Sequence, residues 1–285
     1  MTTQPIAVTG ATGVLGGYLA RGLAERGISQ RLLVRTPAKA PQLPHSTVHQ
    51  FSYSDRSASM SALEGVGTLF MVSASESADR LDQHRTFIDA AAAAGVQHIV
   101  YTSFVAAAPD AIFTLARDHH STEEHIKSSG MTWTFLRDNF YLDFMEALVG
   151  EDGIIRGPAG EGRAAIVARA DIARTAEVIL VDPIQHAGRT YDLTGPEALT
   201  LDEVAATITR VRGHTVTFYD ESLEEAYRSR ASFGAPAWQV DAWVSTYTAI
   251  AGNVMAPVSI DIESITGTAP MNLETYLRHH PITLR

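Results

Sequence analysis

The sequence contains no cysteine and almost no lysine. Without cysteine, its 285 residues can form no disulfide, no thiol nucleophile and no cysteine metal site. Lys39 and Lys127 are the only lysines, and the formal net charge is −10. A protein that neutralises the phosphates of a nucleic acid normally carries a basic patch. We therefore expect no direct nucleic-acid partner.

Long hydrophobic runs are also missing. No apolar run approaches the roughly 18 residues of a membrane span, and residues 1–5 lack the basic and apolar segments of a secretory signal. We therefore expect a soluble, cytoplasmic protein with no membrane partner. Hydrophobic residues make up 45% and charged residues 19% of the chain, so a globular fold with a substantial core is expected.

The chain is organised around a glycine-rich turn near its start. Gly10, Gly13 and Gly16 follow an apolar run at 5–9 and precede a helical pattern that ends at Gly27. The alternative interpretation is an ordinary strand-to-helix turn. A dinucleotide pyrophosphate needs glycines here because its phosphates approach the amides of a helix N-terminus closely. The expected pyrophosphate-binding residues are Gly10, Ala11, Thr12, Gly13, Val14, Leu15 and Gly16.

The end of the second expected strand, at 30–35, indicates which dinucleotide binds. An NAD-binding protein places an acid here for the ribose hydroxyls, but no acidic residue occurs between Glu25 and Asp55. Arg35 and Lys39 stand there instead and suit a ribose 2′-phosphate, although both could be solvated surface cations. NADPH is the expected cofactor and NADH the second choice. Asp55 either binds the adenine amino group or caps the next helix.

Strands and helices alternate over the first half of the chain, which predicts an α/β fold with a doubly wound Rossmann-type parallel sheet. Further strands are expected at 47–51, 68–72, 98–103 and 131–136, and helices at 78–94 and 113–129, the first with Leu81, Arg85, Ile88 and Ala92 on one helical period. Ligands lie at the carboxyl ends of such strands. The residues expected there are Val72, Ser73, Ala74, Ser75, Ser103, Asn139, Phe140 and Tyr141.

The alternation loosens after about residue 150. The segment 150–162 is rich in glycine and predicts a loop at the edge of a second unit. We expect 1–150 to form an NADP-binding Rossmann domain to which 171–193 returns, and 151–285 to form a smaller, mainly helical C-terminal substrate lobe. Local patterns also predict a strand at 164–167, a helix capped by Asp171, a strand at 189–193 and a helix that begins with a capping box at Thr200.

Several segments together carry a family resemblance over about the first two hundred residues. They are TGATGVLG at 9–16, Arg35 with Pro37 and Lys39, LEGVGTLFMVSASE at 63–76, QHRTFIDAAAAAGVQHIVYTS at 83–103, TFLRDNFY at 134–141 and ARADIARTAEVI at 168–179. The chain resembles the NmrA-like atypical short-chain dehydrogenase/reductases, and among them most the type 2 NADPH:quinone oxidoreductases. The resemblance implies that 10–16 hold the pyrophosphate and Arg35 and Lys39 the 2′-phosphate. It places the nicotinamide between 72–75, Ser103 and 139–141.

The Tyr-x-x-x-Lys pair of ordinary short-chain dehydrogenases is absent, because none of the nine tyrosines has a lysine four residues later. His119, which shares a helical face with Glu123 and Lys127, is the first catalytic candidate, as a proton donor titrating near neutrality. The alternative is an exposed helix with ion pairs four residues apart. Ser103 is the second candidate, with a structural strand-end hydroxyl as its alternative. Tyr141 is the third, and it either stacks a flat substrate or packs within the lobe.

These observations predict a reductase that passes hydride directly from NADPH to a small quinone-like or conjugated carbonyl substrate, without flavin. No metal is expected because no His-Glu-x-x-His spacing is present. A quinone needs no strong enzyme acid, since conjugation stabilises the oxyanion that forms on it. Two alternatives stay open: a tailoring enzyme that reduces a polycyclic aromatic quinone whose product then reacts with oxygen, and a non-catalytic NADP sensor with a protein partner. The oligomeric state stays open, with a homodimer as one possibility.

Overall fold

The computed structural model describes residues 4–280. Its main layer is a seven-stranded sheet with the order β3-β2-β1-β4-β5-β6-β8, and every neighbouring pair of strands is parallel. The fold is thus the predicted doubly wound Rossmann-type α/β fold with a smaller C-terminal lobe. The strands of this sheet are β1 (Ile6–Thr9), β2 (Gln30–Val34), β3 (Ser46–Gln50), β4 (Thr68–Met71), β5 (His98–Phe104), β6 (Thr132–Asp138) and β8 (Arg189–Leu193).

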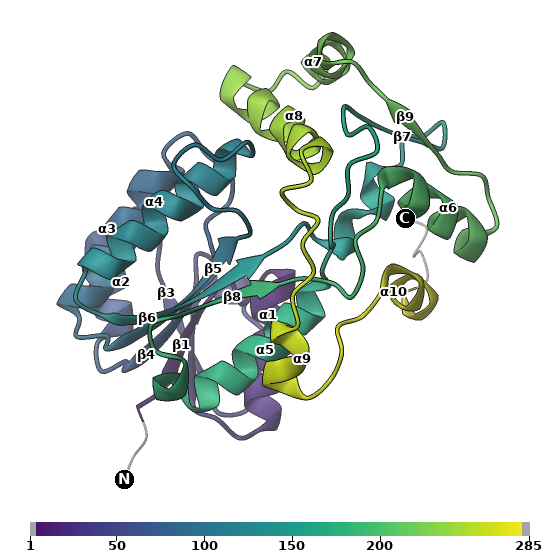
Figure 1. Ribbon diagram of the computed structural model, residues 1–285. Helices are drawn as coiled ribbons and strands as arrows, with labels where there is room; N and C mark the ends of the chain where they lie inside the picture. Colours follow the sequence, from purple (N-terminus) through teal and green to yellow (C-terminus); the bar gives the residue numbers. More distant parts are fainter. Residues whose placement is uncertain (1–3, 281–285) are drawn as a thin grey trace.

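Helices cover both faces of the sheet (Figure 1). Alternate strand residues enter opposite cores: Val8 and Leu32 lie in one buried cluster, Ala7 and Leu33 in the other. Burial on both faces explains why these strands read as nearly continuous apolar runs. One face carries α1 (Val14–Glu25), α5 (Arg169–Val181) and α9 (Asp261–Thr266), and the other α2 (Arg56–Leu63), α3 (Arg80–Ala93) and α4 (Thr114–Ser128).

A smaller lobe stands beyond the carboxyl ends of the strands (Figure 1). It has its own buried cluster, which includes Ile155, Leu201, Ile208, Ile250 and Leu277. The capping box at Thr200 is present, as predicted, and opens α6. The lobe contains a parallel pair of strands, β7 (Ile154–Gly157) and β9 (Thr217–Asp220), with α6 (Leu201–Arg212), α7 (Leu223–Ala231), α8 (Ala237–Ala251) and α10 (Leu273–His279). Short 3-10 turns are η1 (Pro37–Lys39), η2 (Leu142–Phe144), η3 (Glu146–Leu148) and η4 (Pro183–His186).

Three local predictions were wrong. The segment 164–167 makes only isolated bridges, and the strand β7 lies instead inside the segment predicted as a loop. The strand β7 forms because it pairs with β9, about sixty residues later. Strand formation depends more on such tertiary pairing than on local composition. Asp171 does not cap α5, which begins after Ala168. Its carboxylate accepts from the Met271 amide at 2.7 Å and so ties the C-terminal segment to α5.

No helix within residues 4–280 has the length and apolar character needed to cross a membrane.

Candidate active site

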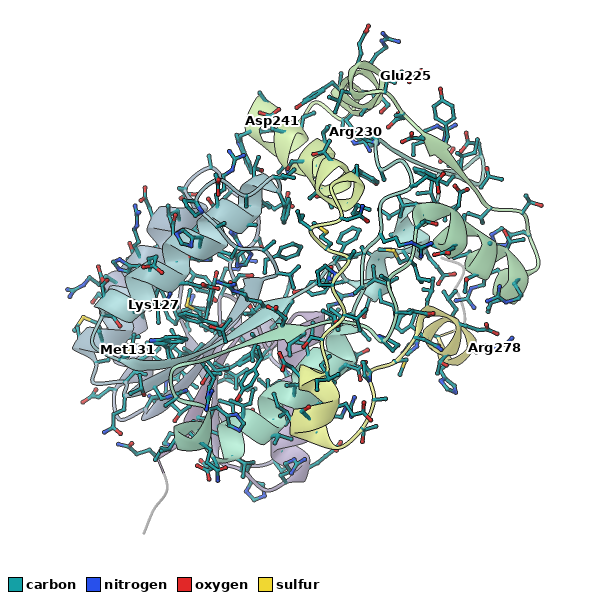
Figure 2. The ribbon with its side chains drawn as sticks, viewed as in Figure 1. Lys127, Met131, Glu225, Arg230, Asp241 and Arg278 are labelled. Atoms are coloured by element: carbon teal, nitrogen blue, oxygen red, sulfur yellow. The ribbon has the colours of Figure 1, made fainter. Side chains whose placement is uncertain are left out.

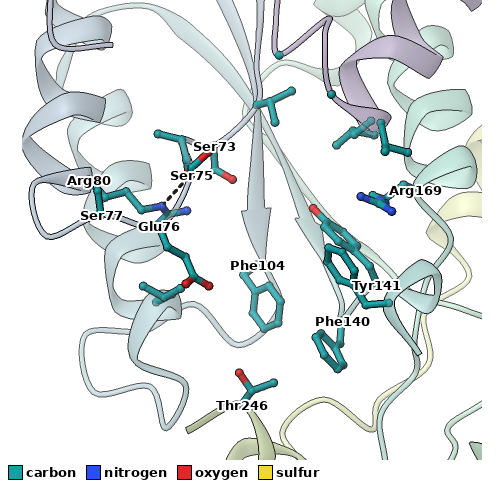
Figure 3. Close-up of a pocket in the computed structure, with 18 of the residues that line it drawn as sticks. Ser73, Ser75, Glu76, Ser77, Arg80, Phe104, Phe140, Tyr141, Arg169 and Thr246 are labelled. Carbon is teal, nitrogen blue, oxygen red and sulfur yellow. Dashed lines mark hydrogen bonds between the residues drawn. The ribbon is translucent and has the colours of Figure 1, made fainter. Parts of the chain in front are cut away.

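A cleft of about 1400 Å³ opens at the carboxyl ends of the strands, between the sheet and the lobe (Figure 3). The structure brings most of the predicted site residues together in its wall, although they come from five different strand ends and, for His119, from α4 (Thr114–Ser128). The predicted residues that line it are Gly10, Thr12, Gly13, Val14, Leu15, Gly16, Arg35, Val72, Ser73, Ala74, Ser75, Ser103, His119, Asn139, Phe140 and Tyr141. Ala11, Lys39 and Asp55 do not line this cleft.

The glycine turn has the geometry that its sequence predicts. Gly10 adopts φ +67°, a left-handed conformation that favours glycine, and its carbonyl accepts from the Gly13 amide at 2.8 Å. A Cβ on Gly16 would stand 2.4 Å from the Gly10 carbonyl oxygen. Strand β1 and helix α1 therefore meet too closely for any side chain at position 16. The N-terminus of α1 faces the cleft with no side-chain cap, as anion binding requires.

Arg35 lies directly after β2, at the junction of the main cleft and an adjoining hollow of about 790 Å³. Asp55 lines that hollow, but its Oδ1 accepts from the Ala58 amide at 2.9 Å, so the capping role is the one seen. Lys39 is exposed on η1 and lines neither cavity. Of the two predicted cations, Arg35 alone borders the cleft.

The arginines of the cleft differ in their partners. Arg80, Arg156, Arg169 and Arg230 each form an ion pair with a carboxylate. Within residues 4–280, no carboxylate oxygen lies within 4 Å of a nitrogen of Arg35. Its positive charge is therefore available to an anion.

Two buried residues that sequence reasoning missed, Arg80 and His84, hold the loop after β4. The Arg80 Nε donates to the Ala74 carbonyl at 2.9 Å (Figure 3). The Ala74 amide donates to His84 Nε2 at 2.8 Å. Both backbone groups of Ala74 are thus fixed at the cleft wall. Of the residues assigned to one helical period, Ile88 is buried, whereas Arg85 is exposed; α3 also buries Arg80, His84 and Phe87.

His119 is not the near-neutral proton donor that the sequence predicts. The Arg80 guanidinium can only donate, so at 3.1 Å His119 Nε2 must accept from it. The imidazole proton is therefore on Nδ1, 2.9 Å from the Tyr101 hydroxyl. Burial, with the charge of Arg80 and the neighbouring His84, holds the pKa of His119 well below its usual value. At neutral pH this imidazole is neutral, and its single proton is already hydrogen-bonded.

Glu123 is buried beneath the site. The alternative prediction, that it lies on an exposed face of α4 and forms ion pairs with residues four positions away, was therefore wrong. Its carboxylate accepts from Arg137 Nε at 2.9 Å and Nη2 at 2.7 Å, and from the Ser103 hydroxyl at 2.6 Å. Ser103 and Arg137 are paired neighbours on β5 and β6, so both reach the same acid. Lys127 pairs with Glu124 at 2.7 Å instead, far from the lobe (Figure 2). The hydroxyl proton of Ser103 is thus already hydrogen-bonded to Glu123.

The crossing from β6 to the lobe carries the remaining predicted residues. Asn139 is buried; its Nδ2 donates to the Met255 carbonyl at 2.9 Å and its Oδ1 accepts from the Phe140 amide at 2.7 Å. Asn139 therefore fixes the chain path rather than presenting free polar groups. The Tyr141 hydroxyl lies 3.0 Å from Asp138 Oδ2, and the Arg169 guanidinium lies 5.6 Å from the centre of its ring. Figure 3 shows Tyr141 across the cleft from Ser73 and Ser75.

The buried histidines make stability depend on pH. Burial, followed by the charge of Arg80, lowers the pKa of both His84 and His119 well below the value of about 6.5 expected in the unfolded chain. The unfolded state therefore binds protons that the folded state does not. The stabilisation is complete above about pH 6.5 and declines as pH falls, by up to about 1.4 kcal/mol per pH unit for each histidine.

Urea unfolding at pH 7.5, 6.5 and 5.5 checks this. His119→Asn is expected to reduce the slope below pH 6.5, and the exposed His214→Asn to leave it unchanged. A stability that is flat between pH 6.5 and 5.5 in the unsubstituted chain would contradict the assignment of neutral buried imidazoles.

Within residues 4–280, no group of three or more His, Asp or Glu side chains is arranged to hold a metal ion. The parallel sheet and the glycine turn at its topological switch point define a Rossmann-type α/β fold, in which dinucleotides bind at this edge of the sheet. The family model that matches this chain, over residues 2–242, is the NmrA-like family. The chain belongs to the NmrA-like family.

Named relatives agree with this assignment. The chain is 38% identical to quinone oxidoreductase 2 of Escherichia coli (strain K12) over 238 residues, which cover 81% of this chain and 82% of the relative. It is 30% identical to the NAD(P)H azoreductase of Xenophilus azovorans over 280 residues, covering 96% and 97%. The crystal structure of the E. coli NADPH-dependent quinone oxidoreductase complexed with NADPH matches with a TM-score of 0.87 and 34% identity, covering 96% of this chain and 99% of that chain.

Proposed function

We propose that the chain reduces a quinone-like or conjugated carbonyl substrate by direct hydride transfer from NADPH, without flavin. Its kinship with named NAD(P)H-dependent oxidoreductases makes it an oxidoreductase of that type. The observation that carries the choice of NADPH is Arg35, which is the one cleft arginine without a carboxylate partner in the described chain. We assign the cofactor to 1–150 with 171–193, and the substrate to the lobe at 151–285 together with the facing residues Phe104, Phe113, Phe140 and Phe144.

The residues present fit this cofactor. The pyrophosphate would lie on the Gly10–Gly16 turn, where three glycines without side chains and the N-terminus of α1 suit an anion. Arg35 would bind the 2′-phosphate with its forked guanidinium, and the hollow beside it would take the adenine. The loop held by Arg80 and His84 would wall the nicotinamide. When bound there, NADPH supplies a hydride from C4 of its nicotinamide.

The rest of the cleft suits a flat aromatic acceptor. Beyond the strand ends its wall carries seven aromatic side chains among aliphatic and polar ones, and rings offer stacking surface to a flat substrate. Phe104 and Phe113 have ring centroids 4.9 Å apart, and Phe233 and Trp243 have theirs 6.0 Å apart. The aromatic residues of this part are Phe104, Phe113, Phe140, Phe144, Phe233, Trp243 and Tyr247. A quinone or polycyclic quinone fits this wall, and positioning over the nicotinamide supplies much of the rate.

One observation favours the non-catalytic alternative. The protons of Ser103 and His119, two of the three predicted catalytic groups, are already hydrogen-bonded inside the protein. A sensor that binds NADP without turnover needs no free acid. Absence of turnover with every acceptor, despite NADPH binding, would support this alternative.

Arg35→Ala tests the cofactor part of the proposal. With NADPH, kcat/KM for a naphthoquinone is expected to fall by about 10- to 100-fold, since a charge-assisted contact to the 2′-phosphate contributes about 1.5 to 3 kcal/mol. With NADH the variant is expected to keep the rate of the unsubstituted chain. NADPH and NADH oxidation is followed with benzo-, naphtho- and polycyclic quinones and an azo dye.

Lys39→Ala is the matched control, because Lys39 is exposed and lies outside the cleft. It should change the rate with NADPH by less than about 3-fold, in line with the small effect of an exposed charge. An equal loss with both cofactors in Arg35→Ala would refute the 2′-phosphate assignment.

A further inference from the structure

A buried acid stands behind Tyr141. Asp138, the last residue of β6, is 1% exposed, and its Oδ2 lies 3.0 Å from the Tyr141 hydroxyl. Its Oδ1 is also buried and has no hydrogen-bond partner within residues 4–280. A carboxyl group in these surroundings has one polar neighbour, the phenol, and no cation at ion-pair distance in the described chain.

This environment favours the uncharged acid. An ionised carboxylate without a countercharge is costly in a protein interior, and the neutral acid costs much less. Burial raises the pKa of Asp138 well above its usual range, and the bond to Tyr141 only partly opposes this shift. Burial and the neighbouring Asp138 also raise the pKa of the Tyr141 phenol, so Tyr141 alone is a weak proton donor.

Two charged groups face the pair from neighbouring elements. Arg169 of α5 lies over the Tyr141 ring, and Asp143 of η2 lies 3.2 Å from Arg169 Nε. The positive charge of Arg169 lowers the pKa of Tyr141, and the negative charge of Asp143 raises it. Arg169 therefore favours a transient negative charge on the phenol, while the Arg169–Asp143 pair stays close to neutral overall.

The direction of the hydrogen bond decides what Tyr141 can do. If Asp138 were ionised, the phenol would donate to it and would have no proton for a substrate. When Asp138 is neutral, its own proton can lie on Oδ2 and be donated to the Tyr141 oxygen. The phenolic proton is then free to point into the cleft, which Tyr141 lines.

We propose that Tyr141 is the catalytic proton donor of the reductase and that Asp138, acting through it, is the internal proton reserve. The inference rests on the proposed function. The acceptor gains two electrons with the hydride that the cofactor supplies, and the oxyanion that forms takes the phenolic proton of Tyr141. The bond from Asp138 Oδ2 to its proton breaks as this proton passes to the Tyr141 oxygen. Asp138 is left as a carboxylate, which regains a proton from water before the next turnover.

Asp138→Asn and Tyr141→Phe test the proposal, since both keep the shape of the site. Tyr141→Phe is expected to lower kcat with a quinone by at least 10-fold, at the weak end of general-acid catalysis. In the unsubstituted chain kcat should fall as pH rises through the titration of Asp138. Asp138→Asn is expected to lower the low-pH plateau and to abolish this decline.

Measurements other than turnover distinguish a structural effect of the substitutions from the loss of a proton donor. Both variants are expected to bind NADPH within about 3-fold of the unsubstituted chain by fluorescence titration, a change below 1 kcal/mol. Infrared spectra are expected to show the carbonyl stretch of a protonated buried carboxyl group, lost in Asp138→Asn. Tyr191→Phe, on β8 and outside the cleft, is the matched control and should leave the pH profile unchanged.

Three outcomes would overturn the proposal: an unchanged pH profile in Asp138→Asn, an unchanged kcat in Tyr141→Phe, or no protonated-carboxyl band that depends on Asp138. If the unsubstituted chain turns over while both variants match it, the relay fails and the proposed function stands. If the unsubstituted chain oxidises no NADPH with any acceptor, both fail together.

Discussion

A Gly16→Ala variant is expected to bind NADPH at least 100-fold more weakly than the unsubstituted chain. The added Cβ would lie 2.4 Å from the Gly10 carbonyl oxygen and 2.8 Å from that of Thr9, and neither backbone atom can move aside as a side chain would. The turn must open, which displaces the amides that would hold the pyrophosphate. A 100-fold loss corresponds to about 2.7 kcal/mol, and fluorescence titration measures it.

Gly17→Ala is the matched control one residue further along α1. Its Cβ would meet the flexible end of Arg21 at 3.2 Å and the Ala11 carbonyl oxygen at 3.4 Å, so only a small adjustment is needed. We expect NADPH affinity within about 3-fold of the unsubstituted chain, a change below 1 kcal/mol. Equal affinities of the Gly16→Ala and Gly17→Ala variants would contradict the role given to the close contact of β1 with α1.

Arg137→Leu is expected to destabilise the fold by about 3 to 5 kcal/mol, because it removes one partner of a buried ion pair. Glu123 is 1% exposed, and without Arg137 its charge would keep only the Ser103 hydroxyl among its present partners. Urea unfolding at neutral pH measures the loss.

A double variant, Glu123→Leu with Arg137→Leu, separates the cost of the unpaired charge from the loss of packing. It should recover much of the stability, since replacing both members of a buried pair by apolar groups is often neutral. The surface pair Arg26–Glu177 supplies the comparison, and Arg26→Ala should cost less than about 1 kcal/mol. A double variant as unstable as Arg137→Leu would show that packing, and not the unpaired carboxylate, dominates.

Local patterns in the sequence were sufficient to predict the sheet and the glycine turn. Short apolar runs predicted the strands of the main sheet to within a few residues, and the glycine spacing predicted the turn in which Gly10 is left-handed and Gly16 is crowded. These features depend on residues close together in the chain. The parallel pairing of β7 with β9 depends on segments far apart, and a glycine-rich composition at 150–162 hid it.

The polar network under the site could not be predicted for the same reason. Sequence spacing suggested that Glu123 faces Lys127 on α4, but the partner that satisfies its charge, Arg137, comes from β6. Arg80 was missed because the period assigned to this helix ran through Leu81, Arg85, Ile88 and Ala92, and an arginine is rarely fully buried unless it is paired. Its acceptors, the Ala74 carbonyl and His119, become neighbours only through the tertiary fold.

The most direct test of direct hydride transfer is an anaerobic single turnover followed at 340 nm by stopped flow. The purified chain is first checked for bound flavin by its absorbance, then mixed with equimolar NADPH and a naphthoquinone. The account predicts stoichiometric NADPH oxidation by flavin-free protein, with the same result for a polycyclic quinone. Tight NADPH binding with no oxidation by any acceptor, or oxidation only when flavin is added, would contradict it.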